Sequence, residues 1–169
     1  MLKTRAPLGM LLFLLNEGVL FFMLIAAYVY FHSSTAATAA RNLNLAAAAI
    51  FTAFLLASSY TMWRAAVTGS RPWLAGTLVL GAIFLCGQGD EYWHLFRQNV
   101  TIGRNQFGST FFTLTGVHAL HVFIGLILVA VLLRGTASRT MTDSIALYWY
   151  FVDAVWIVVF AVVYLWTFL

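Results

Sequence analysis

The chain has 169 residues, of which 63% are hydrophobic and only 8% are charged. A soluble domain carries about 25% charged residues, so this chain could not cover a water-facing surface, and its long apolar runs predict an all-α, polytopic membrane protein. The net charge of +4 does not indicate nucleic-acid binding, because the basic residues fall in short stretches between apolar segments. The single cysteine, Cys86, excludes an internal disulfide.

The first apolar run covers about residues 8–31 and is predicted to be a membrane-spanning helix. Lys3 and Arg5 precede it as they would a secretory signal, but the run is too long for one and lacks a small-residue cleavage site. It contains Glu17, about 14 Å from its start and so near the middle of a hydrocarbon layer about 30 Å thick. An ionisable residue at this depth is a candidate functional residue, and a carboxyl without a partner there is expected to be protonated. The alternative is a neutral glutamic acid that hydrogen-bonds to a neighbouring helix.

Two further spans are predicted at about residues 43–63 and 73–95. In the second span, alanines at helical spacing form a stripe that is typical of a helix-packing surface: Ala46, Ala49, Ala53 and Ala57. The third span ends in a charged group near the membrane surface, which comprises Asp90, Glu91, His94 and Arg97. We interpret this group either as a functional site or as an ion-paired rim that headgroups and water solvate.

The fourth and fifth spans are predicted at about residues 108–133 and 145–168, and residues 1–169 are predicted to form a single transmembrane domain. One face of the fourth span contains Thr110, Leu114, His118, His121 and Gly125. Two imidazoles and a glycine on one face indicate contact with protein, because lipid cannot satisfy them. Histidines three residues apart could chelate a metal ion, but the chain offers only four histidines and one isolated cysteine. No metal or other cofactor is therefore predicted in this chain.

The distribution of basic residues predicts which side of the membrane each terminus faces. Five spans place the two termini on opposite sides. The N-terminus and the second and fourth loops contain six basic residues, namely Lys3, Arg5, Arg64, Arg71, Arg134 and Arg139, and the other loops contain three, namely Arg41, Arg97 and Arg104. This asymmetry predicts a cytoplasmic N-terminus and an outer C-terminus. Arg64, Arg71, Arg134 and Arg139 would then face the anionic leaflet and could contact phospholipid, although the positive-inside bias alone explains them equally well.

The same topology places several polar residues at one depth in the membrane. Asp153 lies about 12 Å into the fifth span, and His121 lies about 20 Å into a span that runs the other way. Both depths match that of Glu17. We therefore hypothesise an intramembrane polar cluster of Glu17, His118, His121 and Asp153, in which His121 contacts one of the carboxyls. The alternative is that each side chain finds its own backbone or hydroxyl partner.

Three stretches, in order along the chain, closely resemble the cytochrome c oxidase subunit III family. The segment from Phe107 to Gly125, FGSTFFTLTGVHALHVFIG, is similar to the family's signature helix. The matching residues are Gly108, Ser109, Thr110, Phe111, Phe112, Thr115, Gly116, His118, Leu120, His121 and Val122. The runs from Gln88 to Tyr92 and from Tyr148 to Trp156 point the same way. Three ordered matches are far more specific than one short motif.

Individual residues both follow and depart from this pattern. Glu17 stands in the place of the glutamate of the family's first conserved helix, and Glu91 and Tyr92 match its Glu-Tyr pair. Asn16 replaces the usual serine, and Tyr150 replaces a histidine. The role of that histidine therefore does not carry over to this chain.

The resemblance covers roughly Leu11 to Trp166, which corresponds to the last five of the family's usual seven helices. It implies a short, prokaryotic form, located in the plasma membrane. It also implies a non-catalytic subunit of a terminal oxidase that couples dioxygen reduction to proton pumping. Haem and copper would belong to a catalytic partner, subunit I, with subunit II in the same complex.

Three alternatives remain open at this point. The chain could be the third subunit of a quinol oxidase, a related small protein that accompanies nitric oxide reductase, or an independent small transporter. The first two share this helix pattern. Against the third, the sequence shows neither an inverted repeat nor a pair of broken helices.

Overall fold

The computed structural model describes residues 8–31, 43–102, 106–135 and 138–166 of the chain. These residues form long helices and no strand: α1 (Leu8–Tyr30), α3 (Leu45–Thr68), α4 (Arg71–Arg97), α5 (Gln106–Arg134) and α6 (Arg139–Phe160), which continues as a π-helix over Ala161–Leu165. The described residues contain 5 helices that are long and apolar enough to cross a membrane. The predicted all-α membrane fold is thus confirmed. Four basic residues of the charge count, Lys3, Arg5, Arg41 and Arg104, lie outside the described residues.

Two helices extend further than the apolar runs predict. Helix α3 ends at Thr68 and not near residue 63, and Gly69 closes it in the left-handed conformation at φ 68°, with its N–H bonded to the Ala65 carbonyl at 2.8 Å. Helix α6 begins at Arg139 and not near residue 145, because the Ser138 side chain caps it by accepting from the Met141 N–H at 3.3 Å. Polar residues at the ends of a membrane helix remain helical where it emerges from the hydrocarbon. The two helices therefore extend beyond the predicted spans.

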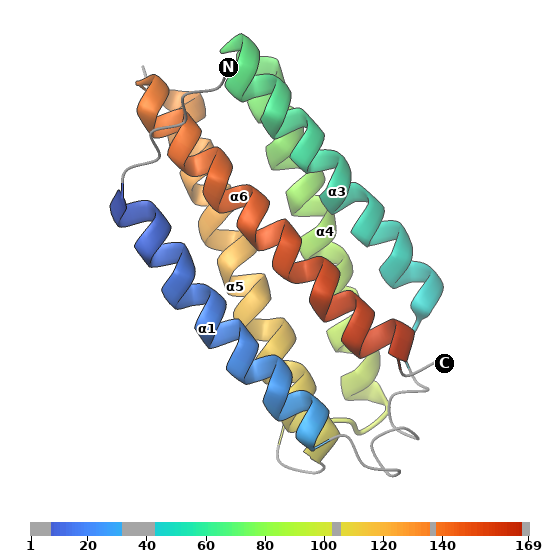
Figure 1. The fold of residues 1–169 in the computed structure, drawn as a ribbon. Helices are drawn as coiled ribbons and strands as arrows, with labels where there is room; N and C mark the ends of the chain where they lie inside the picture. Colours follow the sequence, from blue (N-terminus) through green and yellow to red (C-terminus); the bar gives the residue numbers. More distant parts are fainter. Residues whose placement is uncertain (1–7, 32–42, 103–105, 136–137, 167–169) are drawn as a thin grey trace.

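Four of the helices form a bundle, and α1 lies along one side of it. Helix α3 packs against α4 and α6, and α5 packs against the same two helices, whereas α1 contacts α5 and α6 (Figure 1). The buried residues of α1 are Leu14, Phe21 and Tyr28, which recur every seven residues. A seven-residue spacing keeps one narrow stripe facing a neighbouring helix. Most of α1 is therefore open to its surroundings.

The centre of the bundle is organised around Trp149 of α6. Its ring is 1% exposed, and its Nε1 donates a hydrogen bond to Ser58 Oγ of α3 at 3.0 Å. On the other two helices the ring meets glycines: a Cβ added at Gly81 of α4 or Gly125 of α5 would lie 2.9 Å from ring atoms of Trp149. One tryptophan thus joins four helices, and it fits only because both glycines lack a side chain.

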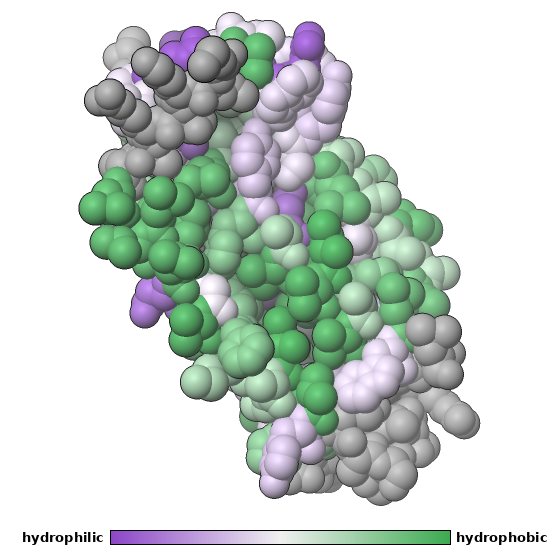
Figure 2. Space-filling view, viewed as in Figure 1, coloured by the Kyte–Doolittle hydropathy of each residue, from purple (hydrophilic) through white to green (hydrophobic). Residues whose placement is uncertain are grey.

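The outer surface of the bundle is apolar across its middle and more polar towards one end. Figure 2 shows hydrophobic residues over the centre of the visible face and a concentration of hydrophilic residues near the top. The predicted alanine stripe belongs to this outer surface, because Ala46, Ala49, Ala53 and Ala57 are exposed. Helix α3 packs through Ala48, Thr52, Leu55, Ser58, Met62 and Ala65 instead. This buried stripe begins two residues later, which turns it by about 200° to nearly the opposite side of the helix. The predicted alanine stripe is therefore not the surface through which α3 packs inside this chain.

Candidate functional site

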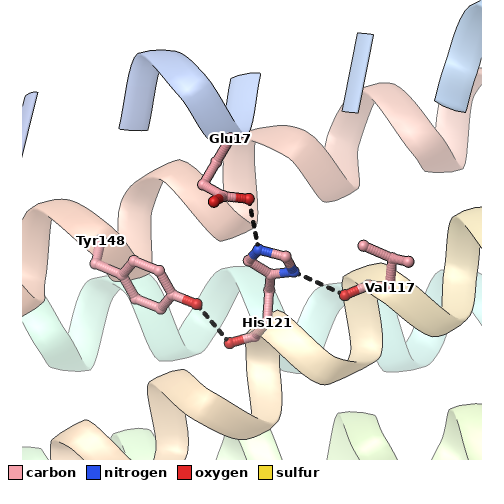
Figure 3. Close-up of polar contacts among 4 residues, drawn as sticks. All are labelled: Glu17, Val117, His121 and Tyr148. Carbon is pink, nitrogen blue, oxygen red and sulfur yellow. Dashed lines mark hydrogen bonds and ion pairs between the residues drawn. The ribbon is translucent and has the colours of Figure 1, made fainter. Parts of the chain in front are cut away.

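Helices α1 and α5 bring Glu17 and His121 into contact inside the membrane-spanning region. Glu17 Oε2 lies 3.1 Å from His121 Nε2 (Figure 3). The other ring nitrogen, Nδ1, lies 2.8 Å from the carbonyl oxygen of Val117, one helical turn earlier. The Tyr148 hydroxyl of α6 donates to the carbonyl oxygen of His121 at 3.0 Å. Three helices therefore fix the position of this imidazole.

The Val117 contact determines where the protons of the pair can lie. A carbonyl oxygen only accepts hydrogen bonds, so His121 Nδ1 must carry a hydrogen. Nε2 then has two options: it accepts from a protonated Glu17, or it carries a second hydrogen and donates to a carboxylate. In either case the pair holds one exchangeable proton and has no net charge, which avoids the cost of an isolated ion in the membrane.

The pair is close to the surface of the bundle rather than sealed in its centre. The side chains of His121 and Glu17 are 11% and 14% exposed. Phe21, one turn after Glu17 on α1, covers the imidazole edge-on, with ring centroids 5.0 Å apart. A small part of the Glu17 side chain is therefore open to the surroundings of the bundle.

We predict that a hydrophobic carbodiimide modifies Glu17 in preference to Asp90 and Glu91. Such reagents concentrate in the hydrocarbon, where Glu17 lies, whereas Asp90 is exposed near the end of α4 and Glu91 is held by the Tyr164 hydroxyl and the Asn44 N–H. Mass spectrometry of labelled peptides measures the site of modification, and Glu17→Gln serves as the control that removes it. Label found only on Asp90 and Glu91 would contradict the prediction.

Asp153 has a different partner from Glu17. It is 3% exposed in α6, and its Oδ2 accepts a short hydrogen bond from Ser59 Oγ of α3. Its other carboxyl oxygen has no hydrogen-bond partner among the described residues. Tyr148, which contacts His121, lies five residues earlier on α6, and five residues turn a helix by about 140° beyond one full turn. Asp153 therefore faces α3, whereas Tyr148 faces α5 and contacts His121.

His118 is also separate from the pair. It is fully buried, and it stacks on Trp156 of α6 with ring centroids 4.8 Å apart. Neither of its ring nitrogens has a hydrogen-bond partner within the described residues. The hypothesised four-residue cluster is thus corrected to two hydrogen-bonded pairs, Glu17–His121 and Ser59–Asp153, and one histidine packed against an aromatic ring. Over the described part of the chain, no group of three histidine, cysteine or acidic side chains could hold a metal ion.

Glu91 and Tyr92 link helices at the end of the bundle where α3 begins and the π-helix after α6 ends. Glu91 accepts from the Tyr164 hydroxyl at 2.7 Å and from the backbone N–H of Asn44, the N-cap of α3, at 3.3 Å. The Tyr92 hydroxyl and Thr115 Oγ1 of α5 lie 2.7 Å apart. The predicted ion-paired rim is not formed by Glu91, because its partners are a phenol and a helix N-terminus, where a carboxylate is favoured.

The four arginines predicted to face lipid have three different environments. The guanidinium of Arg64 lies over the rings of Trp73 and Trp63, at 5.3 and 6.0 Å from their centroids. Arg71 and Arg139 line one cavity, where α4 and α6 begin. Arg134 is exposed at the end of α5 and does not line that cavity.

Two residues of the site, Ser59 and Tyr148, are not predicted by sequence analysis. Tyr148 lies in one of the three stretches that resemble the family. That resemblance is the signal that could have identified it as a hydrogen-bond partner for His121. Ser59 lies in an alanine-rich span and gives no such signal. Serine and threonine hydroxyls usually bond to their own helix backbone, as Thr52 does to the Ala48 carbonyl at 2.7 Å.

Comparison with known proteins agrees with this geometry. Residues 2–168 match the family model described as cytochrome c oxidase subunit III. The chain is 38% identical to cytochrome c oxidase subunit 3 of Corynebacterium diphtheriae, over 95% of this chain and 88% of the relative. It is also 38% identical to the Synechocystis protein of that name, over 93% and 74%. It is 35% identical to cytochrome bo(3) ubiquinol oxidase subunit 3 of Pseudomonas aeruginosa, over 93% and 83%. The chain therefore belongs to the cytochrome c oxidase subunit III family.

Proposed function

We propose that this chain is a non-catalytic subunit that stabilises the catalytic subunit of a proton-pumping terminal oxidase by packing against its side. Membership of the family makes the chain a multi-pass subunit of a haem–copper oxidase complex. The partner, subunit I, would hold the haem and copper, and subunit II would complete the complex. Subunit I would carry out catalysis, and this chain would stabilise subunit I by packing against it.

One observation carries this proposal: the chain presents small and polar residues on outer faces at membrane depth. The stripe Ala46, Ala49, Ala53 and Ala57 is exposed on α3. Such small residues allow a neighbouring helix to approach closely. Asn16 is exposed on α1 beside Glu17, and an amide facing lipid is unfavourable unless a neighbour satisfies it. Both features suit contact with another membrane protein.

The Glu17–His121 pair adds a second part to the proposed role. It lies near the surface of the bundle and holds one proton that can sit on either residue. When such a pair passes its proton to a neighbour, it stays neutral if it takes up another proton in the same exchange. We infer that it supports proton uptake by the partner subunit.

We predict that the oxidase stripped of this chain keeps its haem absorption and much of its initial turnover, but loses activity sooner and melts at a lower temperature. A partner present at a concentration of about 100 times its Kd adds about 2.7 kcal/mol to the stability of the protein that it binds. This stabilisation does not involve the metal ligands. Haem spectra, the time course of oxygen consumption and thermal melting measure these effects. Adding the purified chain back should restore lifetime and melting. Immediate loss of the haem spectrum, or unchanged lifetime and melting, would refute the role in support.

We also propose that the N-terminus faces the cytoplasm and the C-terminus the outside of a prokaryotic plasma membrane. The asymmetry of six basic residues against three supports this orientation. An alkaline phosphatase fused after Leu169 is expected to be active, and a green fluorescent protein fused there is expected to be dark. The reverse pair of results would overturn the orientation.

The alternative function is the same structural role in a quinol oxidase. One of the relatives is named as a subunit of a ubiquinol oxidase, at 35% identity, against 38% for relatives named as subunits of cytochrome c oxidase. Purifying the native complex and comparing its oxidation of cytochrome c and of a quinol separates the two functions.

A further inference from the structure

A basic cavity lies at the end of the bundle where α3 and α5 end and α4 and α6 begin. Its volume is about 310 Å³. The polar side chains that line it are Arg71, Arg139 and Thr142, and the apolar ones include Leu74 and Leu132. Arg71 is the first residue of α4 and Arg139 the first of α6. Two arginines on different helices thus share one cavity.

An apolar groove adjoins this cavity along α3 and α6. Trp63 and Val67 of α3 and Ala146, Leu147 and Tyr150 of α6 line the groove. Ala66 and Arg139 line both the cavity and the groove, so the two are continuous. Since α6 enters the membrane after Arg139, the groove extends from the charged cavity towards the hydrocarbon.

The two arginines are available to bind an anion. Within the described residues, neither Arg71 nor Arg139 forms an ion pair or a side-chain hydrogen bond, and the one ion pair formed there is Glu17–His121. Asp143 lines the groove one turn after Arg139 without pairing with it. Arg64 differs from both, because its guanidinium lies over two tryptophan rings in cation–π contacts.

We propose that the cavity and the groove together bind one anionic phospholipid. Arg71 and Arg139 hold the phosphate, and an acyl chain lies in the groove against Trp63 and Tyr150. A basic cavity that opens into an apolar groove at a membrane surface matches a ligand with an anionic head and an apolar tail. A free phosphate ion would use the cavity alone and leave the groove without a role. None of its lining residues belongs to the exposed alanine stripe of α3, on which the proposed support of the partner subunit rests.

The test uses the delipidated oxidase complex in neutral detergent and native mass spectrometry. Phosphatidylglycerol is expected to bind at least about tenfold more tightly than phosphatidylcholine with the same acyl chains, because phosphatidylcholine has no net charge. Each arginine near the surface contributes about fivefold in affinity for an anionic headgroup. The double variant Arg71→Gln, Arg139→Gln should therefore weaken phosphatidylglycerol binding about 30-fold. Arg134→Gln, which removes an arginine outside the cavity, is the matched control and should change binding less than about twofold.

A second variant tests the groove. Ala66→Leu places a larger side chain where cavity and groove meet, and it is expected to weaken phosphatidylglycerol binding while leaving the charges unchanged. Melting of each lipid-free complex confirms that the variants remain folded. Equal binding of the two lipids, or an equal loss with Arg134→Gln, would overturn the site. If inorganic phosphate competes as strongly as the lipid, the cavity binds an anion only, and the phospholipid assignment fails. Stripping the chain from the oxidase tests the supporting role independently of these outcomes.

Discussion

Replacing Trp149 with alanine is expected to lower the free energy of unfolding of the chain by about 3 to 5 kcal/mol, the range for removing a large aromatic side chain from a packed core. The ring is 1% exposed and fills the gap between Gly81 and Gly125. In a membrane, helix association depends on close packing and hydrogen bonds more than on the hydrophobic effect. Loss of the ring therefore removes contacts with three other helices and the hydrogen bond to Ser58 Oγ. Unfolding of the chain in mixed micelles, followed by circular dichroism, measures the change.

Two variants calibrate this prediction. Trp149→Phe keeps an aromatic ring between the glycines but removes the N–H donor, so it should cost less than the alanine variant. Trp93→Ala removes a tryptophan that is 60% exposed and should cost about 1 kcal/mol or less. If Trp93→Ala proved as damaging as Trp149→Ala, the central position of Trp149 in the bundle would be wrong.

The second large effect is expected from His121. His121→Leu removes the hydrogen-bond partner of Glu17 and leaves a carboxyl inside the membrane-spanning region, at a cost of about 2 to 3 kcal/mol. The double variant Glu17→Leu, His121→Leu removes both polar groups and should cost less than the sum of the two single variants. The coupling energy from this cycle is expected to be about 1 to 2 kcal/mol, near the upper end for hydrogen bonds between membrane helices. The same micelle titration measures all three variants.

His118 provides a control from the same helix face. It is fully buried, as His121 nearly is, but its ring nitrogens have no hydrogen-bond partner among the described residues. His118→Leu should therefore cost less than His121→Leu, because no polar group loses its partner. Equal costs, with no coupling between Glu17 and His121, would show that the contact between these two residues adds nothing to stability.

The parts of this structure that the sequence predicts are those set by distance along a helix. Hydropathy locates the spans, because the membrane thickness fixes the number of apolar residues needed. The 3.6-residue period places His118 and His121 on the face that meets protein, and both are buried. Depth along the axis also brings Glu17 and His121 to one level, where they meet.

The parts that the sequence does not predict depend on which helices are neighbours. Asp153 is predicted to lie close to Glu17 and His121, but its direction around α6 takes it to Ser59 of α3. The alanine stripe has the predicted spacing, but α3 presents another face to the bundle. Ala46 and Ala48 are equally small, so residue size alone does not distinguish the outer face from the inner one. The position of a residue along its helix axis can be calculated from its residue number. Which neighbouring helix the residue faces depends on how the whole chain packs.

The π-helix at the end of α6 changes how this segment should be aligned with its relatives. In a regular α-helix, Tyr164 would point about 80° away from Trp156, eight residues earlier. The wider turn over Ala161–Leu165 rotates less per residue, so Tyr164 stays on the buried side with Trp156 and reaches Glu91. The turn accommodates one extra residue. A relative that is one residue shorter in this segment can form an ordinary α-helix here and still present a tyrosine to the same glutamate. A one-residue gap in the alignment would then mark a change of helical pitch and not the loss of the contact.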